Sequence, residues 1–380
     1  MWKPDIKSYV IILASSFIFF ETLIASDIPS PEEFLGYEVG ANYALADYGQ
    51  IHDYFKQLDL ASPLLQLQEI GQTTEGRPLI LAIITSTFNQ NYLKKLIETQ
   101  AALADPRGLG EAEILRYIRL GKAIVSINCS IHATEIGASQ MSMELAYRLI
   151  SSKSQDIENI LENVVILLIP AHNPDGVDMV VDWYREHLGS PYEGSRLPWL
   201  YHKYAGHDIN RDWYMLTQKE TRLTVQKIYN VWRPHIVLDL HQMGAIGPRI
   251  FVPPYIDPVD KNIDPILQAE MSEVGASIAS DLIAQGKAGV VIHAIYDAYS
   301  PGRAYTNYHG GARILAETAS PNLASPIEVE QDALVSIGDF DAKKPSWNHP
   351  LLWDGGAWSL RDVIDYELAC SFALLNHVSC

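Results

Sequence analysis

Short runs rich in Val, Ile and Leu recur along this chain, and most of them precede a segment with the pattern of a helix. The clearest runs are residues 123–128, 164–170, 235–240 and 312–316. Strands that are apolar on both faces and alternate with helices are typical of a largely parallel sheet covered by helices on both sides. Two earlier runs, residues 64–72 and 78–86, are joined by Thr74-Glu75-Gly76-Arg77, a hairpin signal. We therefore predict an α/β fold with a mixed sheet.

The pattern fits one domain, from about residue 30 to residue 380, because no linker interrupts it. The run Asn173-Pro174-Asp175-Gly176 is interpreted as a turn. A long loop is expected between the strand that ends at residue 316 and the last helix. One further strand is expected at residues 290–294, and the expected helices are residues 42–60, 91–104, 136–151, 218–232, 258–285 and 360–378.

The net charge limits the kinds of partner that the chain can bind, and the N-terminal residues indicate its cellular compartment. The formal net charge of −18 argues against nucleic acid as a partner and against a polybasic membrane patch. Lys3 and Lys7, an apolar stretch at residues 9–20 and the small residues before Asp27 predict a signal peptide over residues 1–26. A retained membrane anchor is the alternative. The mature chain, residues 27–380, would then be secreted or periplasmic, without a stable membrane partner, and its oligomeric state stays open.

The run Ser130-Ile131-His132-Ala133-Thr134-Glu135 lies where an expected strand gives way to an expected helix. His132 and Glu135 are therefore aimed at one point, and neutral imidazole and carboxylate are ligands that suit zinc. A catalytic zinc needs a third protein ligand, an open position for water and a nearby base. An isolated His-x-x-Glu pair has many false positives, so the rest of the chain has to supply these groups.

Two further polar residues end apolar strands. His241 follows Ile236-Val237-Leu238-Asp239-Leu240, and Glu317 follows Ile314-Leu315-Ala316. In α/β folds the site lies beyond the carboxyl ends of the strands, which is where both residues stand. A carboxylate at a buried strand end is costly for stability, so we expect Glu317 to act as a base on a zinc-bound water.

The run Gly206-His207-Asp208-Ile209-Asn210-Arg211-Asp212 combines three kinds of polar group. Arg211 offers a planar fork that matches a carboxylate, and Asn210 offers an amide donor beside it. Asp208 is a candidate acceptor for the second ring nitrogen of a zinc-bound histidine. A structural ion pair of Arg211 with Asp208 or Asp212 is the alternative for the arginine.

The zinc carboxypeptidase family, which includes carboxypeptidase A, resembles this chain in four motifs that occur in the same order: His132-x-x-Glu135, Asp208-Ile209-Asn210-Arg211, Asp239-Leu240-His241 and Glu317. The resemblance covers roughly residue 51 to the C-terminus. It implies a single domain with a mixed, largely parallel eight-stranded sheet and helices on both faces. Each motif alone is weak, and the four in order are specific.

The resemblance also implies roles for individual residues. One Zn²⁺ per chain would be bound by His132, Glu135 and His241. Glu317 would be the general base, and Asp208 would orient His132. The free carboxylate of a peptide substrate would be held by Asn210 and Arg211.

Two parts of the family pattern have no clear match here. The arginine that polarises the scissile carbonyl is matched best by Arg185, with Arg196 as the alternative. The tyrosine that caps the substrate could be Tyr305 or Tyr308. The chain also departs from the family at two positions, since Gln242 stands where a small hydroxyl residue is common and Asp212 where a neutral residue is common. The negative charge of Asp212 would weaken the binding of a terminal carboxylate.

These features lead to a zinc metallocarboxypeptidase as the first hypothesis. A zinc amidohydrolase that acts on cell-wall peptides or N-acyl amino acids is the second, because fold and site do not fix the substrate. A catalytically inactive peptide-binding module is the third, and the complete ligand set together with Glu317 argues against it. The aromatic-rich residues 191–204 fit equally a wall of the substrate cleft and a loop packed on the surface.

Overall fold

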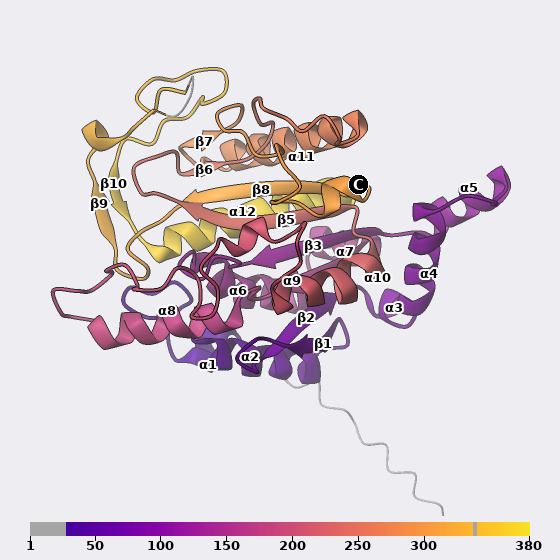
Figure 1. Ribbon diagram of the computed structural model, residues 1–380, viewed down its shortest axis with the longest axis horizontal. Helices are drawn as coiled ribbons and strands as arrows, with labels where there is room; N and C mark the ends of the chain where they lie inside the picture. Colours follow the sequence, from indigo (N-terminus) through magenta and orange to yellow (C-terminus); the bar gives the residue numbers. More distant parts are fainter. Residues whose placement is uncertain (1–27, 337–339) are drawn as a thin grey trace, which may run out of the picture.

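An eight-stranded mixed sheet with the strand order β1-β2-β4-β3-β5-β8-β6-β7 forms the centre of the molecule (Figure 1). This computed structural model describes residues 28–336 and 340–380. Neighbours among β4, β3, β5 and β8 are parallel, whereas the pairs β1-β2, β2-β4 and β6-β8 are antiparallel. The predicted mixed, largely parallel sheet is thus confirmed. The predicted signal peptide lies outside the described residues.

The longer strands coincide with the apolar runs of the sequence. Three short strands in the C-terminal half were not predicted: β6, and the β9-β10 pair, which lies inside the expected long loop. The strands are β1 (Leu65–Gln72), β2 (Pro78–Ile84), β3 (Ala123–Cys129), β4 (Val164–Ile169), β5 (Ile236–Met243), β6 (Ile250–Phe251), β7 (Val290–Val291), β8 (Ala312–Ala319), β9 (Ile327–Val329) and β10 (Gly356–Trp358).

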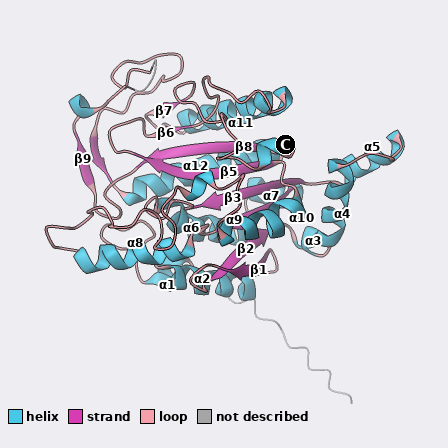
Figure 2. Ribbon diagram, in the orientation of Figure 1, coloured by secondary structure: helices cyan, strands magenta, loops and turns pink. Residues whose placement is uncertain are grey.

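Helices cover both faces of the sheet (Figure 2). They are α1 (Pro31–Leu35), α2 (Tyr48–Ala61), α3 (Thr87–Gln90), α4 (Leu93–Ala104), α5 (Glu111–Leu120), α6 (Gly137–Ser151), α7 (Gln155–Asn163), α8 (Pro174–His187), α9 (Lys219–Thr224), α10 (Asn230–Trp232), α11 (Pro265–Ala284) and α12 (Leu360–Val378). Single turns or short π-helical segments are η1 (Ile209–Arg211), η2 (Val225–Tyr229), η3 (Thr306–Tyr308) and η4 (Gln331–Ala333). None of the helices in the described ranges is long and apolar enough to cross a membrane.

The turn predicted at residues 173–176 is wrong, because these residues begin α8. The side chain of Asn173 accepts a hydrogen bond from the backbone N–H of Gly176, and Pro174 occupies the first helical position. Asn and Pro serve turns and helix N-termini for the same physical reasons, so the local sequence does not separate the two. The helices α5 and α7 were also missed.

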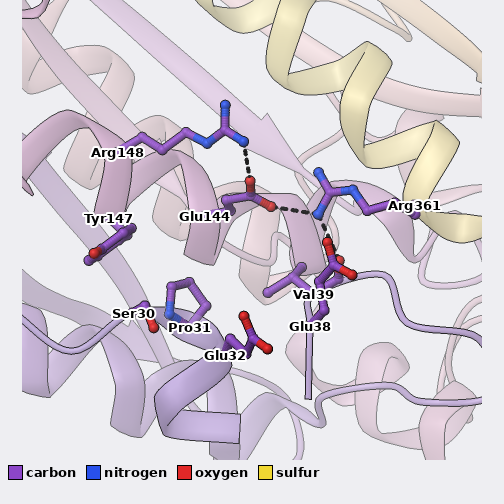
Figure 3. A pocket seen from close by; sticks show the side chains of 9 residues that line it. All are labelled: Ser30, Pro31, Glu32, Glu38, Val39, Glu144, Tyr147, Arg148 and Arg361. Atoms are coloured by element: carbon purple, nitrogen blue, oxygen red, sulfur yellow. Dashed lines mark hydrogen bonds and ion pairs between the residues drawn. The ribbon is translucent and has the colours of Figure 1, made fainter. Parts of the chain in front are cut away.

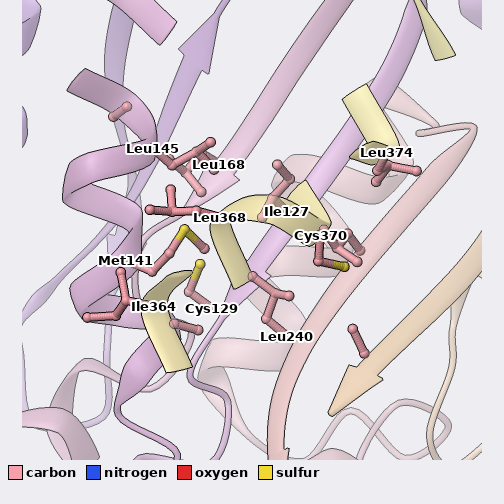
Figure 4. Packing of buried hydrophobic residues seen from close by; sticks show 14 of the residues in the cluster. Ile127, Cys129, Met141, Leu145, Leu168, Leu240, Ile364, Leu368, Cys370 and Leu374 are labelled. Carbon is pink, nitrogen blue, oxygen red and sulfur yellow. The ribbon is translucent and has the colours of Figure 1, made fainter. Parts of the chain in front are cut away.

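Two apolar layers hold the sheet between the helices. The larger layer packs α2, α6, α11 and α12 against one face, and its centre includes Cys129, Met141, Leu240 and Leu368 (Figure 4). The opposite face carries α4, η2 and α10 over β2, β3 and β4. Cys129 and Cys370 are free buried thiols.

One helix-to-loop contact leads to a stability prediction. A Cβ at Gly275 in α11 would lie 2.2 Å from the carbonyl oxygen of Pro253. Gly-to-Ala changes inside helices usually stabilise by about 0.5–1 kcal/mol. Here we expect Gly275→Ala to destabilise by about 1–3 kcal/mol, because helix or loop has to move. Urea unfolding measures this, with exposed Ser280→Ala in the same helix as the control. A Gly275→Ala variant as stable as the wild type would contradict the close packing.

Strand direction brings the expected site residues to one edge of the sheet. The arrowheads of β3, β5 and β8 point the same way (Figure 2). His132 follows β3, and His241 in β5 is paired in register with Glu317 in β8. Residues two apart on a strand share a face, so Asp239 and His241 point to the same side. The carboxyl edge of the parallel strands therefore collects the polar groups.

Candidate metal centre

His132, Glu135 and His241 form a compact cluster whose ligand atoms all lie within 4.8 Å of one another. One carboxylate oxygen of Glu135 is 2.8 Å from Nδ1 of His132. Its other oxygen is 2.8 Å from Nδ1 of His241. The cluster thus draws two ligands from the β3–α6 connection and the third from the end of β5, as the motif positions predicted.

A carboxylate faces the second ring nitrogen of each histidine. Nε2 of His132 lies 2.9 Å from Oδ1 of Asp208, and Nε2 of His241 lies 3.3 Å from Oδ2 of Asp239. An N–H···carboxylate contact at Nε2 leaves the lone pair on Nδ1, which is the form that binds a metal. The sequence indicated Asp208 but not Asp239, although an acid two residues before His241 in an apolar strand was a usable signal.

The charges around the cluster favour a bound cation. Burial alone would lower the pKa of His241, but the carboxylates of Asp239 and Glu135 outweigh burial and raise this pKa to about 10. Burial would raise the pKa of Glu135, but His132 and His241 lower it to about 2. Two imidazoles and one carboxylate are the donor set of catalytic zinc sites that keep a position for water. The residues therefore fit a zinc ion.

The backbone and side chain of Gln242 hold the ligand Glu135 and the start of α6. Its N–H donates to Glu135 over 3.0 Å, and its side-chain oxygen accepts from the N–H of Gly137 over 2.7 Å. Its amide nitrogen donates to the hydroxyl of Ser320 over 3.1 Å. A larger residue than the family's usual hydroxyl side chain thus has a positioning role, which ties β5, β8 and α6 together around Glu135.

Glu317 lies next to His241 on the neighbouring strand. Burial raises the pKa of its carboxyl group, and the negative charge of Glu135 adds to this effect. The positive charges of His241 and Arg303 act in the opposite direction. A carboxyl group whose pKa lies above its ordinary value is better matched to proton transfer near neutral pH.

Arg211 and Asn210 have different surroundings. The side chain of Arg211 is 39% exposed; its Nη1 donates to the carbonyl of Asn210 over 2.9 Å and lies 3.4 Å from Asp208. Asn210 is fully buried: its oxygen accepts from the indole N–H of Trp213 over 2.9 Å, and its nitrogen lies 3.1 Å from Nε2 of His241. The structure therefore places Asn210 under His241 instead of in the open position expected for a carboxylate ligand.

Asp212 does not neutralise Arg211, contrary to what the sequence suggested. Its carboxylate is buried and accepts hydrogen bonds from the hydroxyls of Thr217 and Thr221, each over 2.5 Å. It also accepts from the backbone N–H of Gln218 over 2.8 Å. The negative charge of Asp212 thus stabilises the loop that follows η1, and the ion-pair partner of Arg211 is Asp208.

Three predicted site residues lie elsewhere. Arg185 in α8 pairs with Asp47 over 2.9 Å and donates to the carbonyl of Leu45, so it does not reach the cluster. The hydroxyl of Tyr305 donates to Asn230 over 3.0 Å, and that of Tyr308 to Asp260 over 2.5 Å. Tyr305 adjoins Pro234 and Gly311, which precede β5 and β8, so it lies at the amino edge of the strands. All three lie outside the sheet, in α8 or in and beside η3, so the strand pattern did not determine where their side chains lie. The alternative Arg196 is exposed in the loop after α8.

Tyr201 is an aromatic residue at the cluster to which the sequence assigned no separate role. Its ring stacks on His132 with 4.4 Å between centroids and 15° between planes. Its carbonyl accepts from the side chain of Asn173, which fixes the loop against the start of α8. Burial, followed by the negative charges of Asp208 and Glu135, raises the pKa of Tyr201 to about 12. At least this residue of the aromatic-rich segment 191–204 thus belongs to the site wall.

A separate pocket of about 280 Å³ lies between α1, α6 and α12 (Figure 3). Its charged centre is Glu144, which pairs with Arg148 over 2.5 Å and with Arg361 over 2.7 Å. Arg361 also donates to the carbonyl of Val39. These groups satisfy one another and include no member of the His-Glu-His cluster, so the pocket is a structural junction of three helices.

The contact of Asp239 with His241 predicts a loss of metal affinity. Asp239→Asn removes the carboxylate that keeps the proton on Nε2 of His241. We expect zinc binding to weaken by about 10–100-fold. Competition with a chromophoric chelator measures this, and Asp365→Asn, which alters the half-buried pair with Arg361 away from the cluster, is the control. Unchanged zinc affinity in a folded Asp239→Asn variant would show that Asp239 does not contribute to metal binding.

Comparison with known proteins adds a family match and a shared fold. Residues 51–236 match the family model described as zinc carboxypeptidase. The metallo-carboxypeptidase from Burkholderia cenocepacia aligns with a TM-score of 0.53 and 17% identity, covering 86% of this chain and 68% of that chain. Carboxypeptidase A from Helicoverpa armigera aligns with a TM-score of 0.56 and 13% identity, covering 92% of this chain and 79% of that chain. Bovine thrombin-activatable fibrinolysis inhibitor, in complex with tick carboxypeptidase inhibitor, aligns with a TM-score of 0.52 and 14% identity, covering 88% of this chain and 98% of that chain. No curated protein sequence matches.

The mixed α/β sheet and the His-Glu-His cluster at the carboxyl ends of its strands are the fold and the candidate metal site expected of a metallocarboxypeptidase. In particular, residues 51–236, just under half of the chain, are similar to the zinc carboxypeptidase family. His132 and Glu135 lie inside the matched range, whereas His241 and Glu317 follow it. The fold is what unites these two halves of the site, and the low identities to solved structures support the fold alone.

Proposed function

We propose that this enzyme removes the C-terminal residue of peptides by hydrolysis, with His132, Glu135 and His241 as ligands of one zinc ion. The observation that carries this proposal is the grouping of Glu317 and Arg211 around the ligand cluster at one edge of the sheet. Zinc, when bound, supplies Lewis acidity to the scissile carbonyl and lowers the pKa of a water molecule. A base beside the zinc site can activate water, and an anion-binding group there can hold a free carboxylate, so together they suit hydrolysis of the last peptide bond of a chain.

The protein side chains divide the remaining work. Glu317 accepts a proton from the attacking water and passes it to the nitrogen that leaves when the C–N bond breaks. Arg211 binds the terminal carboxylate of the peptide through its planar fork. The ring of Tyr201 covers one face of His132, which limits the orientations that this ligand can adopt. Asn210, whose oxygen accepts from Trp213, packs against His241.

The role given to Arg211 predicts a defect that depends on the substrate's end group. We expect Arg211→Met to lower kcat/KM for a peptide with a free C-terminus by about tenfold or more, chiefly through KM, because a charge-assisted contact is lost. A copy of the peptide with an amidated C-terminus should be a poor substrate for the wild type. Its kcat/KM should fall little further in the Arg211→Met variant, because it lacks the carboxylate that Arg211 binds. Exposed Arg222→Met is the control.

The end-group comparison also separates this proposal from its main alternative. If Arg211→Met leaves the preference for free over amidated peptides unchanged, selection of chain ends by Arg211 is wrong. Efficient cleavage of amidated peptides, cell-wall peptides or N-acyl amino acids would then favour a zinc amidohydrolase. Product masses distinguish loss of one C-terminal residue from internal cleavage.

Export of the enzyme is a further part of the proposal. The sequence features of residues 1–26 support a signal peptide that is cut before Asp27, which gives a secreted or periplasmic enzyme. N-terminal sequencing of protein recovered from an expressing cell tests this. A mature N-terminus at or near Asp27 outside the cytoplasm is expected, and an intact N-terminus in the cytoplasmic fraction would contradict it.

A further inference from the structure

Arg249 is the largest fully buried side chain among the described residues, and it is not part of the metal cluster. It stands directly before β6, beside the carboxyl end of β8. Its carbonyl accepts from the N–H of Ala319 over 2.8 Å, and its own N–H donates to the carbonyl of Gly289 over 2.9 Å. A Cβ at Gly289 would lie 2.7 Å from Cγ of Arg249. The sheet and the turn before β7 therefore hold this side chain in one place.

Two indole rings lie over the guanidinium group of Arg249. Its Cζ is 3.9 Å from the ring centre of Trp353 and 4.6 Å from that of Trp358. The N–H of Trp358 donates to the carbonyl of Ala319 over 2.8 Å, which fixes this ring at the end of β8. Cation–π contacts attract a desolvated cation, but a ring face is a weak acceptor for an N–H group. The rings therefore explain how the charge can be buried and leave its N–H donors without strong acceptors.

Most N–H donors of Arg249 have no hydrogen-bond partner in the described part of the chain. A guanidinium carries five such donors. Nη2 donates to the carbonyl of Ala245 and, over 2.8 Å, to that of Gly247. Nε and Nη1 are buried, and neither has a partner among the described residues. Leaving a buried donor unpaired is costly, so a group that accepts from these nitrogens would stabilise the folded chain.

The positive charge of Arg249 also lacks a bonded carboxylate. Its hydrogen bonds within the described residues go to backbone carbonyls. Burial lowers the pKa of Arg249 to about 10, and Tyr366 and Asp362 act in the opposite direction. The carboxylate of Asp362 accepts instead from the hydroxyl of Ser359 over 2.6 Å, at the start of α12. A buried cation is ordinarily paired, because its desolvation is expensive. A small anion would supply both the missing charge and the missing acceptor.

A small cavity lies beside Arg249. Its volume is about 10 Å³, which gives room for a single occupant of about the size of a water molecule. The other ionisable side chain on its wall is His349, which is buried and whose pKa burial lowers, against the effect of the carbonyls of Lys344 and Asp341. None of the described residues that line the cavity carries a carboxylate. An anion there meets no negative charge, and the volume excludes sulfate, phosphate and the carboxylate of a peptide.

We propose that this cavity binds one halide ion, chloride in practice, as the counter-ion of Arg249. The ion accepts from N–H donors of the guanidinium that the protein leaves free. It thereby fixes the loop between η4 and β10, which carries His349 and Trp353, against β6 and the end of β8. Glu317 stands two residues before Ala319 in β8, so the ion steadies the strand end that holds the base. The inference does not depend on the proposed function.

Thermal unfolding of the zinc-loaded full chain in two sodium salts tests the proposal. At constant ionic strength, replacement of gluconate by chloride should raise Tm by about 3 °C or more, and the rise should level off as the site fills. Bromide should act as chloride does. Arg249→Met should lose the halide-dependent rise, whereas Arg119→Met, which changes an exposed arginine in α5, should keep it.

Crystals grown in sodium bromide locate the ion independently of stability. We expect an anomalous scattering peak in the cavity beside Arg249. If the peak is missing, or if the Tm of the wild type does not depend on halide, the cavity is not a halide site and the proposal is wrong. A halide-dependent rise that persists in Arg249→Met also overturns it, because the ion then binds elsewhere. If Arg249→Met does not fold, the bromide peak in the wild type decides.

Discussion

Replacement of Glu317 by glutamine is expected to lower kcat by about 10²–10⁴-fold, because the amide cannot accept the proton of the attacking water. Glu317 is paired in register with His241, and burial raises the pKa of its carboxyl group. It is not one of the three clustered ligands, so bound zinc should stay at one ion per chain. Steady-state rates on a peptide with a free C-terminus and metal analysis of the same sample measure both quantities.

The matched control is Glu328→Gln in β9, an exposed glutamate outside the cluster. It should leave kcat within about twofold, as expected for a surface change. A Glu317→Gln enzyme that binds zinc and retains near wild-type kcat would eliminate Glu317 as the base. Loss of zinc together with activity would instead give Glu317 a structural role at the metal site.

Removal of a ligand should have a larger effect on metal binding than any other single change. His241→Ala leaves two protein ligands and also uncovers Asp239, which is buried and would lose its imidazole partner. We expect zinc affinity to fall by more than the roughly 10–100-fold that loss of an outer hydrogen-bond partner costs, with activity lost in parallel. Dialysis against a chelator of known affinity, followed by metal analysis, gives the result.

His377→Ala, in the last turn of α12, is the control for this ligand change. It should keep one zinc per chain and full activity. Stoichiometric zinc in the His241→Ala variant at wild-type affinity would show that the metal binds elsewhere, and the assignment of the cluster would then be wrong.

The sequence predicted the centre of the fold and the metal cluster for a physical reason. The runs that became β3, β4, β5 and β8 are apolar on both faces, and such strands are recognisable without tertiary information. His132, His241 and Glu317 stand at the ends of these strands, and parallel strands bring their carboxyl ends to one edge. Local pattern and sheet topology therefore sufficed for the residues that β3, β5 and β8 carry.

The candidate residues outside the sheet could not be predicted in the same way. Arg185 and Tyr305 have the side-chain chemistry that the family resemblance requires, yet one pairs with Asp47 and the other with Asn230. The strand pattern determines neither the direction of Arg185 in α8 nor that of Tyr305 beside η3, so side-chain chemistry alone did not identify the right residue. Tyr201 lies at the site because distant segments meet there: its ring stacks on His132, and its carbonyl accepts from the side chain of Asn173.

The buried charges were hidden for a different reason. Asp239 and Arg313 each interrupt an apolar strand. A single charged residue in such a strand indicates no role by itself, because the sequence does not show which residue it pairs with. Their contact joins positions 74 residues apart in the chain, and it becomes visible in the folded structure. The same holds for Asp212, whose charge looked harmful to Arg211 until Thr217 and Thr221 were seen to satisfy it.

The most direct test of the account uses the purified mature chain and a mixed peptide library, read by mass spectrometry with zinc present and again after chelation. The account predicts zinc-dependent loss of single residues from free C-termini, restored when zinc is returned and abolished by Glu317→Gln. Release of no C-terminal residue from any peptide, by a chain that binds one zinc ion, would contradict it.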